Sequence, residues 1–229
     1  AQFVEVLDEH GLSDLHWAHD DSTRLGHSGT ALLSAVPMRD VKLGLGKRFD
    51  GTGRWAQATI DTAGGPLTVA SVYVFAGDID KPVQEKYAFL AAMSKWFKAA
   101  QKSAAAGEGH FVVSGDYNVA HTEADIKNWK GNIGKAGFHV DERAYFDEWF
   151  GPKIGVVDLG RRHAGEVDGP YTWWSQRGQA FDTNTGWRID YHVSDSVLAQ
   201  KLSDVRIDKA ATYAERWSDH APLTAVFDL

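Results

Sequence analysis

The sequence of 229 residues contains no cysteine. Disulfide bonds and thiolate metal sites are therefore excluded, so any bound metal ion must use oxygen or imidazole ligands. No apolar run approaches the roughly 20 residues that a membrane-spanning helix needs. The chain also does not open with a basic segment followed by an apolar one, as a secretory signal does. These features predict a soluble protein that does not interact with membranes.

Positive charge is also scarce, because 24 lysines and arginines face 31 aspartates and glutamates, for a formal net charge of −7. This balance argues against broad electrostatic adhesion to nucleic acid, although a local basic patch still binds phosphates. The length suits one large domain with a substantial core. We expect residues 1–229 to form a single domain.

Alternating apolar and polar residues predict several short strands joined by turns. Two of them, residues 55–60 and 67–75, flank the turn-forming residues 63–66 and predict a hairpin. Such short strands are typical of antiparallel or mixed sheets. The other candidate strands are residues 29–33, 110–114, 156–159, 187–193 and 223–227.

Two segments predict helices. Residues 82–106 begin with a proline, end before two glycines, and carry an apolar stripe at helical spacing that we assign to core packing rather than to chemistry. Residues 141–150 have similar aromatic spacing, and Asp141 is a candidate for the cap at the start of this helix. The absence of internal repeats and linkers agrees with one domain.

Residues 115–118 (Gly-Asp-Tyr-Asn) directly follow an apolar strand and place the carboxylate of Asp116 and the amide of Asn118 at its end. The same residue types form ordinary turns, so this motif alone leaves turn and site open. Two later segments favour a site: Asp190 ends another apolar stretch, and Asp219 and His220 precede the last strand. Carboxylates and a histidine at several strand ends indicate metal-assisted phosphodiester hydrolysis.

Each of these residues also has a structural explanation, as a capping aspartate or a buried histidine. In the hydrolase interpretation Asp116 activates water, Asn118 orients the water or the phosphate, and Asp219 fixes the tautomer of His220. We expect these side chains to converge on one cleft.

Five motifs occur in an order that resembles the exonuclease III family of apurinic/apyrimidinic (AP) endonucleases, of bacterial type, within the endonuclease/exonuclease/phosphatase superfamily. The resemblance runs from about residue 26 to the C-terminus. The motifs are residues 115–121 (Gly-Asp-Tyr-Asn-Val-Ala-His), 125–132 (Asp-Ile-Lys-Asn-Trp-Lys-Gly-Asn), 171–177 (Tyr-Thr-Trp-Trp-Ser-Gln-Arg), 188–190 (Arg-Ile-Asp) and 218–222 (Ser-Asp-His-Ala-Pro).

The resemblance implies an α+β fold of the DNase I type, a four-layer sandwich in which two mixed sheets lie face to face and helices flank them. It also implies roles for single residues. Asp116 activates the attacking water, Asn118 and His220 hold the phosphate, Asp219 orients His220 or binds metal, and Asp190 supports the site. The implied cofactor is magnesium or manganese, bound by Asp116, Asn118 and Asp219.

Tyr73 matches the phosphate-contacting tyrosine of the family, although the residues after it depart from the family pattern and a core tyrosine is the alternative. Trp173 matches the aromatic wall of a pocket for a sugar without its base, whereas Trp174 and Trp187 are expected in the core. Four residues match the segment that grips the DNA backbone, with a solvated surface loop as the alternative: Lys127, Asn128, Lys130 and Asn132.

The resemblance thus implies a monomeric cytoplasmic enzyme that hydrolyses phosphodiesters at abasic sites and 3′ ends of duplex DNA. Two other functions stay open: a degenerate relative that binds DNA without cutting it, and a phosphatase that acts on phosphorylated lipids or sugars. The tryptophan at position 173 and the lysine-rich segment disfavour the phosphatase.

The sequence departs from the family at its start. Family members open with an asparagine-bearing strand, a helix, and a second strand that ends in Gln-Glu-Thr. The glutamate of that second strand is the principal metal ligand of the family. Neither strand is found in this sequence. The surroundings of Glu5 and Glu9 do not resemble the end of an apolar strand, so we do not expect either residue to replace that ligand. We therefore expect an N-terminally incomplete domain that is a poor catalyst in this form.

Overall fold

The computed structural model describes residues 2–78 and 83–229, with side chains described from Val4 onward. Its largest unit is a six-stranded sheet in the order β3-β4-β5-β6-β8-β7. Strands β5 and β6 run parallel and the other neighbours run antiparallel, so the sheet is mixed. Its strands are β3 (Arg39–Leu43), β4 (Trp55–Thr62), β5 (Gly65–Tyr73), β6 (His110–Asp116), β7 (Val157–Asp158) and β8 (Asp190–Ser194).

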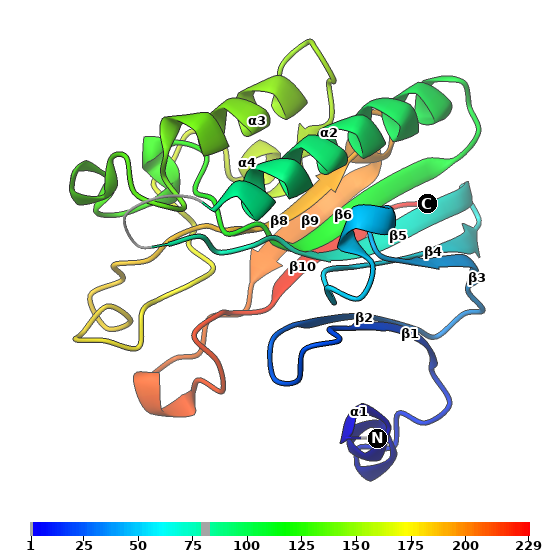
Figure 1. The fold of residues 1–229 in the computed structure, drawn as a ribbon, viewed down its shortest axis with the longest axis horizontal. Helices are drawn as coiled ribbons and strands as arrows, with labels where there is room; N and C mark the ends of the chain where they lie inside the picture. Colours follow the sequence, from blue (N-terminus) through cyan, green and yellow to red (C-terminus); the bar gives the residue numbers. More distant parts are fainter. Residues whose placement is uncertain (1, 79–82) are drawn as a thin grey trace.

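Two antiparallel hairpins accompany this sheet, β1 (His16–Asp21) with β2 (Gly29–Ser34) and β9 (Leu202–Ile207) with β10 (Leu223–Phe227). Figure 1 shows helices α2 and α3 above the six-stranded sheet, the β1–β2 hairpin below it, and α1 below that hairpin. The fold is therefore α+β, with mixed sheets and flanking helices. The helices are α1 (Gln2–Glu9), α2 (Gln84–Ala105), α3 (Val140–Phe150) and α4 (Leu159–Ala164).

In the part of the chain that the structure describes, five short 3₁₀ turns lie in the segments that connect the strands and helices. They are η1 (Lys47–Phe49), η2 (Glu123–Asp125), η3 (Trp129–Asn132), η4 (Leu198–Lys201) and η5 (Tyr213–Glu215). Among the described residues, no helix is both long and apolar enough to cross a bilayer.

The main core lies between the six-stranded sheet and helices α2 and α3. Phe89, Met93 and Phe97 of α2 are fully buried there, and Trp149 of α3 packs edge-to-face against Phe97 with ring centroids 5.1 Å apart. This confirms that the apolar stripe of the long helix is a packing face, because its large side chains exclude water from one side of the sheet.

The predicted hairpin of β4 and β5 is confirmed, and so are the strands around residues 29–33, 110–114 and 223–227. The strand predicted over 187–193 begins only at Asp190, and the strand predicted over 156–159 stops where α4 begins. Strands β1, β3 and β9 were not predicted. Two of these are polar along their length, since β1 reads His-Trp-Ala-His-Asp-Asp and β3 reads Arg-Asp-Val-Lys-Leu.

Both predicted helices form, but their starts differ from expectation. Pro82, the predicted start of the long helix, lies outside the described residues, and α2 begins at Gln84. The prediction that Asp141 caps α3 is wrong, because His139 is the cap and its Nδ1 accepts a hydrogen bond from the backbone N–H of Asp141. Glu142 completes a reciprocal capping box, which satisfies the free N–H groups of the first turn.

Candidate active site

Strands β5 and β6 end, and the antiparallel strand β8 begins, on the same side of the large sheet, which is the left side in Figure 1. Tyr73, Asp116 and Asp190 are paired across neighbouring strands in one line. Beside them lies a cleft of about 440 Å³. The cleft is lined by Tyr73, Ala76, Gly77, Asp78, Asp116, Asn118, Ala136, Gly137, Trp173, Trp187, Ile189, Asp219 and His220.

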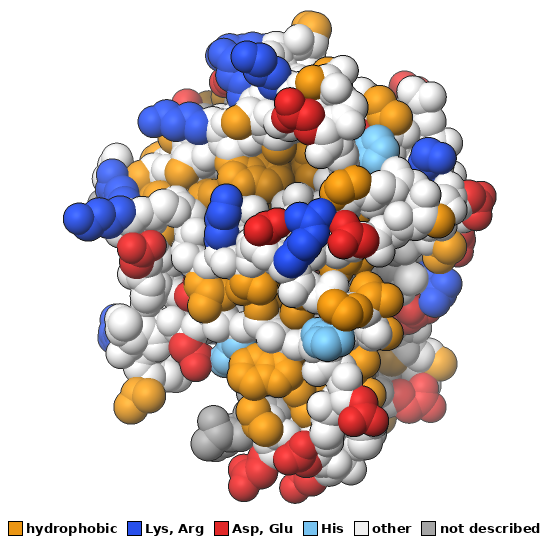
Figure 2. All heavy atoms as spheres, turned by 90° about the vertical axis from the view of Figure 1, so that its right-hand side faces the viewer, with side chains coloured by type: hydrophobic (Ala, Val, Ile, Leu, Met, Phe, Trp, Pro, Cys, Tyr) orange, Lys and Arg blue, Asp and Glu red, His pale blue; other side chains and the backbone are white. Residues whose placement is uncertain are grey.

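Figure 2 shows the opposite side of the molecule, where acidic and basic side chains are interspersed with apolar ones. The proposed catalytic residues belong to the cleft edge, where loops from distant parts of the chain meet.

The backbone geometry at the end of β6 explains the Gly-Asp-Tyr-Asn motif. Gly115 has a φ of +142°, and a side-chain Cβ there would meet the carbonyl oxygen of Val72 at 2.0 Å, so only glycine fits. Asn118 has a φ of +50°, a region that asparagine tolerates better than most residues. Its backbone N–H and its side-chain amide donate to the two oxygens of the Asp116 carboxylate at 2.7 and 2.9 Å.

The pKa of the Asp116 carboxyl group is strongly shifted. Burial raises its pKa to about 7, and the nearby charge of Asp190 adds to the rise. His220, the Asn118 backbone N–H and Lys86 oppose the rise by stabilising the carboxylate. A carboxyl group with a pKa near neutrality is suited to accept a proton from water.

His220 is held by Asp190 rather than by its sequence neighbour. Its Nδ1 lies 2.9 Å from Oδ2 of Asp190. Burial lowers the pKa of His220, but the hydrogen bond and charge of Asp190, together with Asp116 and Asp219, raise it to about 9. The ring is therefore a cation at neutral pH.

The sequence-based role of Asp219 is thus wrong in one respect. Asp219 does not fix the tautomer of His220, because Oδ2 of Asp219 accepts a hydrogen bond from Trp173 Nε1 at 3.1 Å. Asp219 lies in the bend before His220, where its side chain faces Trp173 and not the histidine ring. Asp190, expected only to support the site, is the residue that orients His220.

Two tryptophans form an aromatic wall in the cleft. Trp173 and Trp187 both line it, with ring centroids 6.0 Å apart and ring planes at 89°. The prediction that Trp187 belongs to the core is therefore incomplete, because one side of this half-buried residue faces the cleft. Trp174 is only 2 % exposed and its Nε1 donates to Asn184, as expected for a core residue.

Tyr73 lies at the end of β5 beside a cation that the sequence did not reveal. The guanidinium carbon of Arg54 lies 4.6 Å from the centroid of the Tyr73 ring and 3.9 Å from that of Phe75. Arg54 also donates to the backbone carbonyl of Tyr73 at 3.1 Å. This stacking fixes the tyrosine at the cleft wall.

The four predicted DNA-backbone residues do not line the cleft but lie on the loop between η2 and α3. Lys127, Asn128 and Lys130 are exposed. Lys127 is 3.5 Å from Asp168, a weak surface pair, and the amide of Asn132 donates to the carbonyl of Asn128. The loop is joined to the cleft wall, because the backbone N–H of Lys127 donates to Gly186 next to Trp187.

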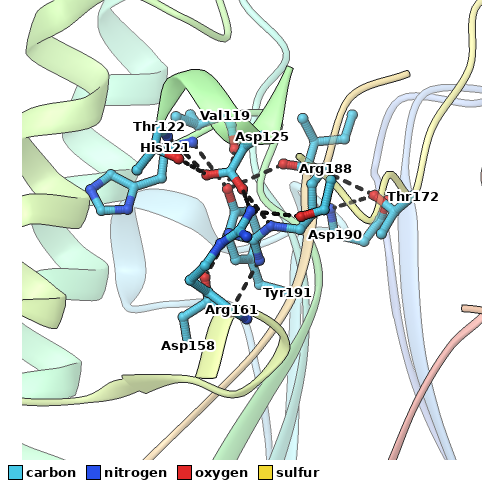
Figure 3. Close-up of polar contacts among 12 residues, drawn as sticks. Val119, His121, Thr122, Asp125, Asp158, Arg161, Thr172, Arg188, Asp190 and Tyr191 are labelled. Carbon is cyan, nitrogen blue, oxygen red and sulfur yellow. Dashed lines mark hydrogen bonds and ion pairs between the residues drawn. The ribbon is translucent and has the colours of Figure 1, made fainter. Parts of the chain in front are cut away.

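A buried charge network anchors the start of this loop (Figure 3). The Asp125 carboxylate accepts from Arg161 and from Arg188, and Arg188 also forms a two-pronged pair with Asp158 at 3.1 and 2.7 Å. Burial favours the neutral form of Asp125, but the arginines hold its pKa well below the usual range. Sequence reasoning missed this network, because its members are scattered over 64 positions of the chain.

Thr172 binds the backbone at the start of the strand that carries Asp190, as Figure 3 also shows. Its buried hydroxyl accepts hydrogen bonds from the backbone N–H groups of Ile189 and Asp190, both at 3.1 Å. The backbone beneath Asp190 is therefore fixed by a side chain next to Trp173.

The donor atoms of the cleft fit a hard divalent cation that is bound together with substrate. Among the described residues, no group of three or more histidine or acidic side chains is close enough to form a preformed metal cage. Magnesium typically uses one or two carboxylates with water and substrate phosphate. Oxygen donors of that kind are present on Asp116, Asn118 and Asp219, all of which line the cleft.

Comparison with known proteins places the chain among nucleases. An exodeoxyribonuclease of Bacillus subtilis is 32 % identical over 222 residues, which cover 94 % of this chain and 81 % of the relative. The 3′ phosphatase NExo from Neisseria, solved with a product DNA hairpin, has 27 % identity and a TM-score of 0.81, covering 99 % of this chain and 83 % of that one. An AP endonuclease from Archaeoglobus fulgidus has 27 % identity and a TM-score of 0.80, with 97 % and 82 % covered.

The two solved structures share the fold of this chain. Residues 2–220 match the Endonuclease/Exonuclease/phosphatase family over almost the whole length. The chain therefore belongs to the endonuclease/exonuclease/phosphatase family.

Proposed function

We propose that this protein is a DNA-repair nuclease that hydrolyses phosphodiesters at abasic sites and at 3′ ends of duplex DNA. The observation that carries the proposal is the pairing of Asp116, a carboxyl group with a pKa of about 7, with cationic His220 in one cleft. This combination supplies a proton acceptor for water and a positive charge for phosphate oxygens.

In this mechanism Asp116 accepts a proton from the attacking water, and the amide of Asn118 holds the carboxylate in place. His220 donates a hydrogen bond to a nonbridging phosphate oxygen while Asp190 keeps the ring charged and oriented. The hydroxyl of Tyr73 contacts the same phosphate from the opposite wall. Water attacks phosphorus in line with the leaving oxygen, and its proton passes to Asp116. As the new P–O bond forms, the bond to the leaving oxygen breaks, and that oxygen takes a proton from solvent.

The family is a class of metal-dependent nucleases. We propose magnesium as the ion, with manganese as a substitute, held by Asp116, Asn118 and Asp219 together with the phosphate of the substrate. When bound, the ion neutralises charge that develops on the phosphate oxygens. Carboxylate and amide donors suit a hard cation of this kind.

The aromatic wall indicates the damaged nucleotide. A flipped-out sugar without its base leaves a ring-sized apolar gap, which Trp173 and Trp187 match. Lys127, Asn128, Lys130 and Asn132 would hold the backbone beside the lesion, since cationic and amide donors position phosphates without reading bases. The expected monomeric state and cytoplasmic location stay predictions.

Two alternatives lose support from these features. A degenerate DNA-binding relative would not need a carboxyl group tuned to neutrality beside a charged histidine. A phosphatase for lipids or sugars would not need the tryptophan wall and the exposed lysine loop together.

The proposal is tested by incubating the protein with magnesium and three substrates: a duplex with one abasic site, the same duplex intact, and a phosphorylated sugar. Cleavage at the abasic site, with slower loss of nucleotides from 3′ ends, is expected. Hydrolysis of the sugar phosphate alone would contradict the proposal.

A further inference from the structure

Lys86 is a fully buried cation in the first turn of α2 that does not line the cleft, although its charge helps to stabilise the Asp116 carboxylate. Its Nζ donates to the backbone carbonyls of Ala76 at 3.1 Å and Asn118 at 2.8 Å. It also forms an ion pair of 2.7 Å with Glu142, whose side chain is equally buried. Two N–H groups of the ammonium are thus used by backbone carbonyls, and the Glu142 carboxylate balances its charge.

Glu142 extends the connection to a third part of the cleft. Its Oε2 accepts hydrogen bonds from the backbone N–H groups of Gly137 at 2.7 Å and His139 at 3.1 Å. Ala76, Asn118 and Gly137 all line the cleft. The pair therefore joins three cleft-lining segments that follow β5, follow β6 and precede α3.

Stability alone is a weak reason to keep such a pair. Two buried ions lose their hydration, and apolar residues of similar volume often stabilise a fold equally well. An apolar side chain, however, cannot donate to two carbonyl groups. One of those carbonyls belongs to Asn118, whose φ of +50° is uncommon and must be held by its surroundings.

We propose that Lys86 and Glu142 form a positioning pair that holds Asn118 and the adjoining cleft walls in the geometry required for phosphodiester hydrolysis. This inference rests on the proposed function. Neither side chain touches substrate, because both are fully buried, so the pair acts through the backbone of the residues that do.

Two variants separate positioning from stability. Lys86→Met together with Glu142→Gln leaves no unpaired charge, replaces the ammonium side chain by an apolar one that is one heavy atom shorter, and retains an amide oxygen for Gly137 and His139. Glu142→Gln alone keeps the donors of Lys86 for Ala76 and Asn118 but removes the charged partner, so it is the less stable protein. Each variant is compared with the parent for Tm, and for kcat and KM on an abasic-site duplex at saturating magnesium.

We expect the variant with the higher Tm to have the lower kcat. The double variant should have a higher Tm than Glu142→Gln, because it leaves no unpaired buried charge. Its kcat should fall roughly 10- to 100-fold, because small displacements of a phosphate-binding group cost that much. Glu142→Gln should have a lower Tm and a kcat within about threefold of the parent, since the hydrogen bonds to Asn118 persist. A kcat that follows Tm in both variants would overturn the proposal.

The matched control is Arg39→Met with Asp61→Asn, which removes an exposed pair joining β3 and β4. It should change neither kcat nor KM. If the double variant fails to fold, the test uses Glu142→Gln by itself. A loss of more than tenfold in the kcat of that variant, measured well below its Tm, would overturn the proposal.

Crystal structures of the variants provide a readout that does not depend on activity. Displacement of Asn118 in the double variant, but not in Glu142→Gln, is expected, and an unmoved Asn118 in the double variant would overturn the positioning role. Absence of abasic-site cleavage by the parent protein would instead contradict the proposed function, so the two failures are distinguishable.

Discussion

The centre of the cleft and the loop beside it differ in how firmly the protein holds their polar groups. Asp116, Asp190 and His220 are linked by hydrogen bonds and mutual charge, and two of them have shifted pKa values of about 7 and about 9. Lys127 and Lys130 instead extend into solvent. Preorganised groups in a partly buried site act strongly on developing charge, whereas exposed lysines contribute weaker, salt-screened attraction. The difference supports the proposal that the first region performs the chemistry and the second binds the DNA backbone.

The largest expected effect is the loss of the water-activating group. Asp116→Asn keeps the shape of the side chain but removes proton acceptance, so abasic-site cleavage should fall about 10³-fold. Binding of the duplex should stay within a few-fold of the parent, as measured by fluorescence anisotropy beside single-turnover cleavage. A variant that cuts at the parental rate would remove Asp116 from this role.

The second effect separates the two acidic neighbours of His220. Asp190→Asn should lower kcat about 10²-fold, because the ring loses its orienting partner. It should also lower the pKa of His220, so the loss should be greater at pH 8, where the ring becomes neutral, than at pH 6. Asp219→Asn should be rescued by raising the magnesium concentration, since its proposed role is at the metal. If added magnesium restored the activity of Asp190→Asn as fully as that of Asp219→Asn, the two aspartates would not have these separate roles.

The third effect concerns the aromatic wall. Trp173→Ala should raise KM for an abasic-site duplex about tenfold, because contact with an aromatic ring contributes roughly 1–3 kcal/mol per nucleotide. Trp217→Ala is the control, since that tryptophan is 83 % exposed and does not line the cleft. If both changes alter KM alike, the wall has no special part in substrate binding.

The smallest effect belongs to the exposed loop. Lys130→Ala should weaken DNA binding by only a few-fold and reduce the slope of log K against log salt by about 0.9, the amount for one phosphate contact. Lys153, paired with Glu148 on the surface, provides the matched control. An unchanged salt slope for Lys130→Ala would show that Lys130 does not contact a phosphate of the DNA.

The sequence predicted the parts of the fold that local patterns determine. The alternating residues of β4 and β5 and the helical spacing of Phe97 with its neighbours are such patterns. The end of β6 was also predictable, because Gly115 and Asp116 follow a short apolar run. In contrast, β1 and β3 carry many polar residues, so their pairing depends on tertiary contacts rather than on their own sequence.

Partners across the site were less predictable, because they depend on register between distant strands. Adjacency in sequence favoured Asp219 as the partner of His220, yet β8 presents Asp190 to the ring. Lys86 left a readable signal, since it lies four residues before Leu90 and seven before Met93, on the buried face of α2. A lysine at such a position requires buried partners, but their identity comes only from the fold.

The most direct test of the account is an NMR titration of the Asp116 carboxyl carbon in the metal-free protein, assigned with Asp116→Asn. The account predicts a midpoint of about 7, because burial and Asp190 both disfavour the charged form. The carboxyl group would then lose its proton just where the site needs a base, at neutral pH. A midpoint near 3.8, the ordinary value for aspartate, would contradict the claim that the cleft tunes Asp116 to accept a proton from water.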